Sequence, residues 1–309
     1  MTAPGLAAYG LMSLGHRLIA ATSRGLCRSL DAGATWRPLD GPPVVAPALA
    51  ALEAPDGSAV LLAGGAGGVR RSTDGGASWA TTLVGSPITA LASDRDRTGD
   101  AIALAGTETD GILRSVDGGN RWQSAIAGLL DLEILCLALS PAFGADNTGF
   151  AGTASGLYRT RNGGRAWRPL SSPAGEPAVQ CVAFAPDFDE TGVVLAGTEE
   201  DGLVRSSDGG NTWAAVASLG DCGITAVAWS ATPGLVLAAT AEGIVRSVDA
   251  GQSWHRVGET APVFALAFAA GPSEEVALAC LAEGGIARSV DRARSWQLAE
   301  FYDLDSAPG

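Results

Sequence analysis

The chain has 309 residues, of which 17% are charged and 47% hydrophobic, and its formal net charge is −13. A net negative charge repels the phosphate backbone of nucleic acids, and no cluster of Lys or Arg of the kind that neutralises phosphates occurs, so the sequence argues against nucleic acid as a partner. No apolar run approaches about 18 residues, the length that a membrane-spanning helix needs, so no membrane span is predicted.

The first residues, MTAPGLAAYGLMSLGHRLIAA, lack the basic segment that opens a secretory signal peptide. The five cysteines show no CxxC spacing and lie mostly in apolar stretches, so we predict reduced thiols that pack in the core rather than disulfides or metal ligands. Both features favour a cytoplasmic location.

One short pattern repeats seven times along the chain, at intervals of 41 to 46 residues. The pattern is Gly-apolar-x-Arg-Ser-x-Asp-x-Gly-x-x-Trp, where x is any residue. A repeat of this length indicates a propeller or a solenoid. The copies end at Trp36, Trp79, Trp122, Trp167, Trp213, Trp254 and Trp296.

Within the third copy four short strands are predicted, at residues 87–93, 101–107, 111–116 and 121–126. Four strands per copy form one blade of a propeller. We therefore predict an all-β fold, a single seven-bladed β-propeller over residues 1–309 with four antiparallel strands per blade. In chain order the blades are expected at approximately 3–40, 43–83, 87–127, 133–171, 177–218, 222–258 and 262–301, followed by a short C-terminal tail whose role as an outer strand stays open.

The repeated pattern places a tight turn between the third and fourth strands of each blade. In the third copy this turn runs from Ser115 to Trp122. Oxygens of Ser115 and Asp117 are expected to accept hydrogen bonds from turn amides, and glycine to supply a positive φ. Trp122 is expected to fold back under the turn and to bury about 150–250 Å². The residues equivalent to Asp117 are Asp31, Asp74, Asn162, Asp208, Asp249 and Asp291.

These turns resemble the Asp-box, and the chain resembles the Asp-box, or bacterial neuraminidase repeat, propeller superfamily over essentially its whole length. The resemblance implies a fold like that of sialidases and of the photosystem II assembly propeller. Two copies depart from the pattern: the fourth has Thr160 and Asn162, and the seventh has Ala293 where glycine is expected. We expect these two turns to be weaker than the others.

The resemblance raises the question of sialidase activity, for which the sequence offers no catalytic set. Sialidases use an axial arginine trio, a tyrosine nucleophile with a glutamate partner, and an aspartate acid/base. Here the tyrosines are Tyr9, Tyr158 and Tyr302, and none stands in a recognisable pattern with a partner acid. The two histidines, His16 and His255, occupy non-equivalent positions. No catalytic residue, metal ligand or cofactor is predicted.

An arginine precedes every turn, and a ring of seven guanidinium groups is a candidate anion site. Because the position falls in the third strand, away from the axis, we expect each side chain to lie between blades and to pair with backbone carbonyls or a neighbouring acid. These residues are Arg28, Arg71, Arg114, Arg159, Arg205, Arg246 and Arg288.

The loops between the second and third strands carry acidic residues that not all copies share. Six of them are candidates for binding, Glu108, Asp110, Glu199, Asp201, Glu242 and Glu283. In propellers these loops share a face with the connections between blades, which here add Asp131, Glu133, Glu176 and Asp221. One face is therefore expected to be acidic, as a solvated rim or as a docking surface for a cation or for a partner with a basic surface.

We interpret the protein as a non-enzymatic binding or scaffold propeller that mediates protein–protein interaction or complex assembly. Two alternatives stay open: a carbohydrate-active enzyme of the sialidase or glycoside hydrolase type, and a binder of small molecules or cations through the acidic loops. The sequence names neither the partner nor the oligomeric state, because the repeated turn reports how a blade is held together rather than what it contacts.

Overall fold

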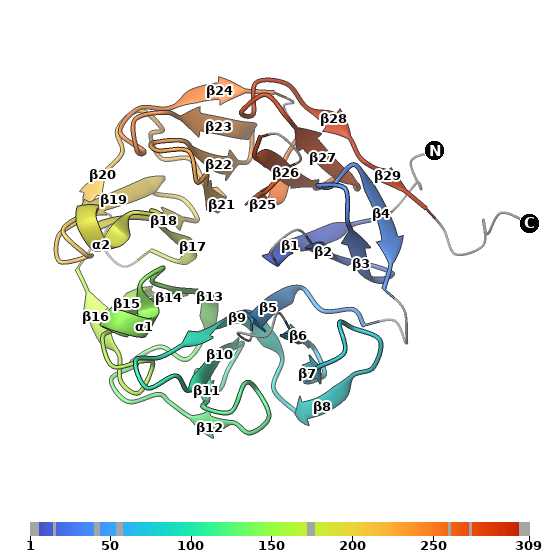
Figure 1. Ribbon diagram of the computed structural model, residues 1–309. Coiled ribbons are helices and arrows are strands. Elements are labelled where there is room, and N and C mark those ends of the chain that lie inside the picture. The colour runs from blue at the N-terminus through green and yellow to red at the C-terminus, as the bar shows by residue number, and fades with distance from the viewer. Residues whose placement is uncertain are drawn as a thin grey trace, which may run out of the picture.

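The computed structural model describes residues 6–14, 17–39, 44–53, 58–171, 177–258, 261–271 and 274–302. The chain forms a seven-bladed β-propeller with four antiparallel strands per blade, as predicted, and the blades surround a central axis (Figure 1). Two four-residue helices, α1 (Phe143–Asp146) and α2 (Phe188–Thr191), lie in loops of blades four and five. No helix among the described residues is long and apolar enough to cross a membrane.

The first three blades span the N-terminal part of the chain. Blade one contains β1 (Ala8–Leu14), β2 (Arg17–Thr22), β3 (Gly25–Ser29) and β4 (Thr35–Pro38). Blade two contains β5 (Ala48–Glu53), β6 (Ala59–Gly65), β7 (Gly68–Ser72) and β8 (Ala80–Leu83). Blade three contains β9 (Ile88–Arg95), β10 (Ala101–Thr107), β11 (Ile112–Ser115) and β12 (Gln123–Ser124).

The remaining four blades repeat the same strand order. Blade four contains β13 (Ile134–Leu139), β14 (Gly149–Thr153), β15 (Gly156–Thr160) and β16 (Arg168–Leu170). Blade five contains β17 (Val179–Phe184), β18 (Val193–Thr198), β19 (Leu203–Ser207) and β20 (Ala214–Ala215). Blade six contains β21 (Ile224–Trp229), β22 (Val236–Thr240), β23 (Gly243–Ser247) and β24 (His255–Val257). Blade seven contains β25 (Val263–Ala269), β26 (Val276–Leu281), β27 (Ile286–Ser289) and β28 (Gln297–Leu298).

The first strand of each blade lies nearest the axis and the fourth lies at the rim (Figure 1). The core is therefore divided among the seams between blades, and each of seven clusters of buried side chains joins two neighbouring blades. In the seam between blades four and five, for example, Phe150 of β14 meets the indole of Trp213 edge-on, with ring centroids 5.9 Å apart. Apolar burial of this kind supplies the main stabilisation of each seam.

The ring is closed by contacts between the last blade and the first. After β28 the chain continues into β29 (Glu300–Phe301), which pairs in parallel with β4 at the outer edge of blade one. The ring of Phe301 stacks on that of Trp36 at 6.2 Å between centroids. The end of the described chain thus adds a fifth strand to the first sheet, which answers the question that the sequence left open.

The loops of the disc divide into two faces, and backbone hydrogen bonds show which loops share a face. On the connection face, the loops between second and third strands contact the connections between blades: Glu108 N donates to Pro87 O at 3.2 Å, and Glu199 N donates to Ala178 O at 3.0 Å. This arrangement is the one expected from the sequence.

The opposite face, the turn face, combines the repeated turns with the loops between first and second strands. There Gly118 N donates to Ala101 O at 2.9 Å, and Gly209 N donates to Gly192 O at 3.0 Å. The two faces therefore present different sets of loops, and any ligand or partner meets one set or the other.

Candidate functional site

Each repeated turn on the turn face is closed by a small hydrogen-bond network between its serine and its aspartate. In blade three, Ser115 Oγ donates to Asp117 Oδ1 at 2.8 Å and accepts from Gly119 N at 2.9 Å. Asp117 Oδ1 also accepts from the amide of Arg121 at 2.9 Å. These bonds satisfy turn amides that no β-ladder reaches, so the residues are occupied in holding the turn.

The carboxylates of these turns are held in the ionised form by the donors around them. The hydroxyl of Ser78 lowers the pKa of Asp74 to about 2. The hydroxyl of Thr212 likewise lowers the pKa of Asp208 to about 2. A carboxylate that accepts several hydrogen bonds and stays ionised at neutral pH does not serve as a general acid.

The fourth and seventh turns keep the network in altered form. In the fourth, Thr160 Oγ1 donates to Asn162 Oδ1 at 2.8 Å, so an amide takes the place of the carboxylate. In the seventh, Arg292 and Ala293 both have a φ of 62°, a region that glycine adopts freely and other residues resist. The seventh turn therefore carries backbone strain, and the fourth carries no charge on its central acceptor.

The repeated arginines connect neighbouring blades, as expected, rather than facing the axis. Arg71 Nε donates to Gly118 O in the next blade at 2.9 Å. Arg288 Nε donates to Ala32 O at 2.8 Å and so links blade seven to blade one. In the seam between blades six and seven, Arg246 Nε is buried without an acceptor. This series of arginines belongs to the framework of the disc and not to an anion site on the axis.

The connection face collects the acidic residues singled out in the sequence. Its described loops and connections contain ten acidic residues and one basic residue, Arg24. The six candidates are all exposed and lie in the loops β10–β11, β18–β19, β22–β23 and β26–β27. The acids are Glu108, Asp110, Asp131, Glu133, Glu199, Glu200, Asp201, Asp221, Glu242 and Glu283. Glu176, which was also expected here, lies outside the described residues.

The candidates differ in how far their carboxylates are already engaged. Asp110 Oδ2 accepts from Ser86 Oγ at 2.6 Å, and the carboxylate of Glu242 forms an ion pair with Arg256 of β24. By contrast, no hydrogen bond or ion pair is recorded for the side chains of Glu108 and Glu199 within the described part of the chain. The side chains of Asp201 and Glu283 likewise have none recorded, so four of the six candidates are free to meet a cation from outside.

An apolar ridge, formed by Ile126, Leu130 and Leu132, lies among these acids in the connection between blades three and four. The side chain of Leu130 is 84% exposed, and Ile126 and Leu132 beside it are also exposed, so the three form an apolar patch. Ile126 and Leu132 crowd against Gly111, where an added Cβ would lie 2.7 and 2.9 Å from their methyl carbons. The ridge thus packs against the loop that carries Asp110. The sequence analysis missed this ridge, although an apolar pair around Asp131 in a loop was visible.

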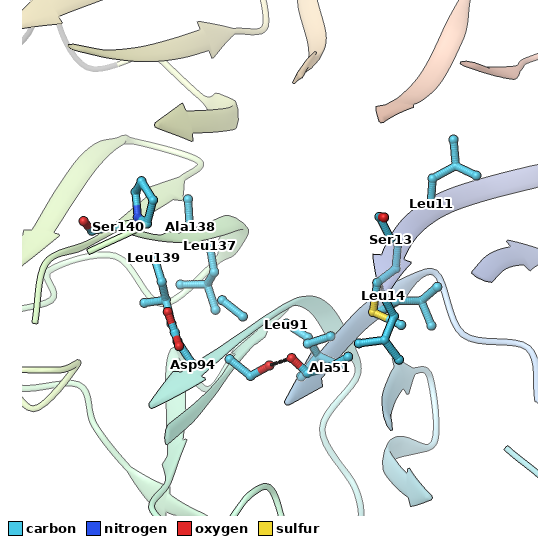
Figure 2. Close-up of a pocket in the computed structure, with 16 residues that line it drawn as sticks. Leu11, Ser13, Leu14, Ala51, Leu91, Asp94, Leu137, Ala138, Leu139 and Ser140 are labelled. Atoms are coloured by element: carbon cyan, nitrogen blue, oxygen red, sulfur yellow. Dashed lines mark hydrogen bonds between the residues drawn. The ribbon is translucent and has the colours of Figure 1, made fainter. Parts of the chain in front are cut away.

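A cavity of about 500 Å³ lies beside the axis, where the first strands of blades one to four end (Figure 2). Leu14, Asp94 and Ser140 mark these strand ends, which lead into loops of the turn face. Asp94 is the one carboxylate among the lining residues. The sequence analysis treated the acids after Ser93 as loop formers and did not single out Asp94 as a functional residue.

Among the described residues, no recorded hydrogen bond joins a tyrosine to an acid near the axis, and Tyr9 of β1 packs against Phe264 with ring centroids 6.5 Å apart. Tyr302 does contact an acid, since its hydroxyl donates to Glu300 Oε2 at 3.2 Å, but Glu300 belongs to β29 at the rim. The hydroxyl of the buried Tyr158 accepts from Leu130 N at 3.3 Å. Over the described residues, no group of three or more His, Cys, Asp or Glu is placed to hold a metal ion.

The five cysteines are in the thiol form and not joined in disulfides. Burial raises the pKa of the Cys136 thiol to about 12, and burial also raises the pKa of Cys181. Since the thiolate is the reactive form, these two side chains are packing residues and not nucleophiles.

No protein-family model and no curated protein matches the chain. Among solved structures it is similar to a GH74 xyloglucanase from Xanthomonas campestris, with 18% identity, a TM-score of 0.71 and coverage of 97% of this chain and 55% of that one. A GH74 enzyme from Niastella koreensis has 15% identity, a TM-score of 0.70 and coverage of 96% and 54%. The chain thus spans about half the length of these two enzymes.

A third similar structure is that of YCF48 bound to D1 peptide, with 17% identity, a TM-score of 0.64 and coverage of 94% of this chain and 95% of that one. Identities this low show the fold alone. The same fold therefore occurs in enzymes and in a protein that binds a peptide, and the choice between these roles has to come from the residues of this chain.

Proposed function

We propose that the protein is a non-enzymatic interaction scaffold whose connection face docks a protein partner with a basic surface. The observation that carries this proposal is the composition of that face, which has ten acids and one arginine among the residues that the structure describes, in loops between strands of the blades. A surface that carries many charges of one sign attracts and orients a partner whose surface carries the opposite charge. The Leu130 ridge adds apolar area that a partner can cover within the acidic surround.

The similarity to a peptide-bound propeller of nearly the same length supports this proposal at the level of fold. The similarity to GH74 enzymes favours an enzyme instead, but this chain covers about half of each. Glycoside hydrolysis generally needs two carboxyl groups flanking the scissile bond. The cavity beside the axis is lined by one, Asp94, and in the pocket that shares Ser13 with it Glu275 is held by Ser230 and Ala231. The residues therefore favour binding over catalysis.

The test is affinity purification from the native host with the wild-type chain and two variants that carry the same change in charge. The first variant, Glu108→Arg with Glu199→Arg, alters the connection face. The second, Asp189→Arg with Glu190→Arg, alters exposed residues of α2 on the turn face. We expect mass spectrometry to find a partner that the wild type and the second variant retain and the first variant loses. Equal recovery with all three proteins would remove the proposal.

A further inference from the structure

The cavity beside the axis is a concave site lined by both alkyl groups and polar groups. Its volume is about 500 Å³, and its walls come from β1, β5, β9 and β13 of four successive blades. Leu14, Leu91, Leu137 and Leu139 contribute alkyl side chains, and Figure 2 shows them around the same hollow as Asp94. A site of this shape and composition is typical of small-molecule pockets.

Asp94 is the charged group of this cavity, and its carboxylate has little to neutralise it. The side chain is half-buried, and its one hydrogen bond comes from the amide of the next residue, Arg95, at 2.6 Å. The guanidinium of Arg95 donates instead to Gly99 O at 3.0 Å, and no ion pair joins it to Asp94. Burial raises the pKa of Asp94, and this effect outweighs the hydrogen bond from the Arg95 amide and the positive charge of Arg95, which lower it.

A second pocket on the same face contains an acid, Glu275, whose hydrogen bonds stabilise the fold. This pocket shares Ser13 with the first and is lined by Glu275. Glu275 accepts hydrogen bonds from the hydroxyl of Ser230 and, at 2.9 Å, from the amide of Ala231 in the neighbouring blade. Glu275 therefore holds the seam between blades six and seven, whereas Asp94 has no comparable structural role.

We propose that the cavity lined by Asp94 binds a small organic cation, an alkylammonium whose charge pairs with Asp94 and whose hydrocarbon body packs on the leucines. A charge-assisted hydrogen bond in a partly desolvated site is stronger than one in water. An anion is disfavoured by the carboxylate, which is the one charged group among the lining residues. This site lies on the opposite face from the proposed docking surface and does not depend on it.

The test compares hexylammonium with its neutral isostere 1-hexanol, each titrated into the full-length protein and followed by amide chemical shifts. We expect hexylammonium to bind at least about tenfold more tightly than 1-hexanol, a difference of the size that one charge-assisted contact produces. The shifts are expected at Ser13 and Ser140, which line the cavity. Equal affinity for the two probes, or shifts elsewhere, would overturn the proposal, and this comparison needs no variant.

Three variants sharpen the assignment. Asp94→Asn is expected to lower the affinity for hexylammonium about tenfold, to that for 1-hexanol. Asp100→Asn removes one negative charge from the following exposed loop and is expected to leave the affinity unchanged. Ala138→Leu fills the cavity from β13 and is expected to abolish binding of both probes. Binding by Asp94→Asn that equals the wild type, with the fold verified by the same spectra, contradicts the site.

Discussion

The two faces of the disc are built from the same blades but use their polar residues differently. On the turn face, the serine and aspartate of six copies bond to one another and to nearby amides, as Ser206 and Asp208 do at 2.8 Å, and Thr160 and Asn162 replace them in the fourth. On the connection face, Glu108 and Glu199 project from their loops with no side-chain bond recorded in the described chain. The difference teaches that the residues shared by the copies maintain the turns, whereas some of the residues that differ between copies have no recorded role in holding the fold.

The largest effect is expected at a glycine of the turn face. In Gly119→Ala the new Cβ would lie 2.5 Å from a methyl carbon of Leu62 in the preceding blade, at a φ of 79°. Strain and overpacking together are expected to lower the free energy of unfolding by about 3 kcal/mol. Urea unfolding measures this loss.

The matched control is a glycine of the connection face. A Cβ on Gly67, in the loop between β6 and β7, would meet nothing within 4 Å. Gly67→Ala is therefore expected to change the free energy of unfolding by less than about 0.5 kcal/mol. A decrease in the free energy of unfolding as large as that of Gly119→Ala would show that both faces constrain their loops equally. That result would contradict the proposed difference between the two faces.

The next effect concerns acid stability. The folded-state pKa of Asp208 is about 2, lowered from 3.8 first by the hydroxyl of Thr212. A lowered pKa contributes stability that is complete above the unfolded value and is lost as pH falls toward the folded value. Asp208→Asn is therefore expected to unfold with a weaker dependence on pH between 4 and 2 than the wild type.

The fourth turn supplies the reciprocal variant for this test. Asn162 Oδ1 already accepts from the amides of Arg165 and Ala166, at 3.1 and 3.0 Å. In Asn162→Asp the new carboxylate inherits these donors, so the pH dependence of unfolding should become steeper in the same range. Titration curves of unfolding that are identical for both variants and the wild type would refute the role of the turn carboxylates.

The smallest effect on stability is expected at the seventh turn. Ala293 is fully buried and has a φ of 62°. Ala293→Gly removes the backbone strain, but it also deletes a buried methyl group and increases the conformational entropy of the unfolded chain. Because the relief of strain is expected to be the larger effect, we expect the free energy of unfolding to rise by about 0.5 kcal/mol. Thermal unfolding measures it, and a loss of more than about 1 kcal/mol would mean that the methyl contact outweighs the strain.

Much of the fold could be predicted because each repeat contains the local signals for its strands and its turn. The spacing of Trp36, Trp79 and Trp122 indicates blades of equal size, and the chemistry of the turn repeats with it. The pairing of the C-terminal tail could not be predicted, since β29 pairs with β4 across almost the whole chain. Such a pairing depends on where two ends meet in space and leaves no local pattern.

The candidate sites divide in the same way. The acids at Glu108 and Glu199 stood out in the sequence because equivalent loops of two copies could be compared. Asp94 did not, because its setting requires strands from four blades to converge and to exclude part of its water. Leu130 was missed for a related reason: its exposure depends on how Ile126 and Leu132 pack against Gly111.

The contrast between the faces is tested most directly with the partner that affinity purification identifies. Its dissociation constant is measured for the wild-type chain and for the two double variants. Glu108→Arg with Glu199→Arg is expected to weaken binding by at least about tenfold, with a loss that shrinks as salt screens the charges. Asp189→Arg with Glu190→Arg is expected to bind as the wild type does. Equal affinities for all three proteins, or an equal loss in both variants, would contradict the account that the connection face is the docking surface.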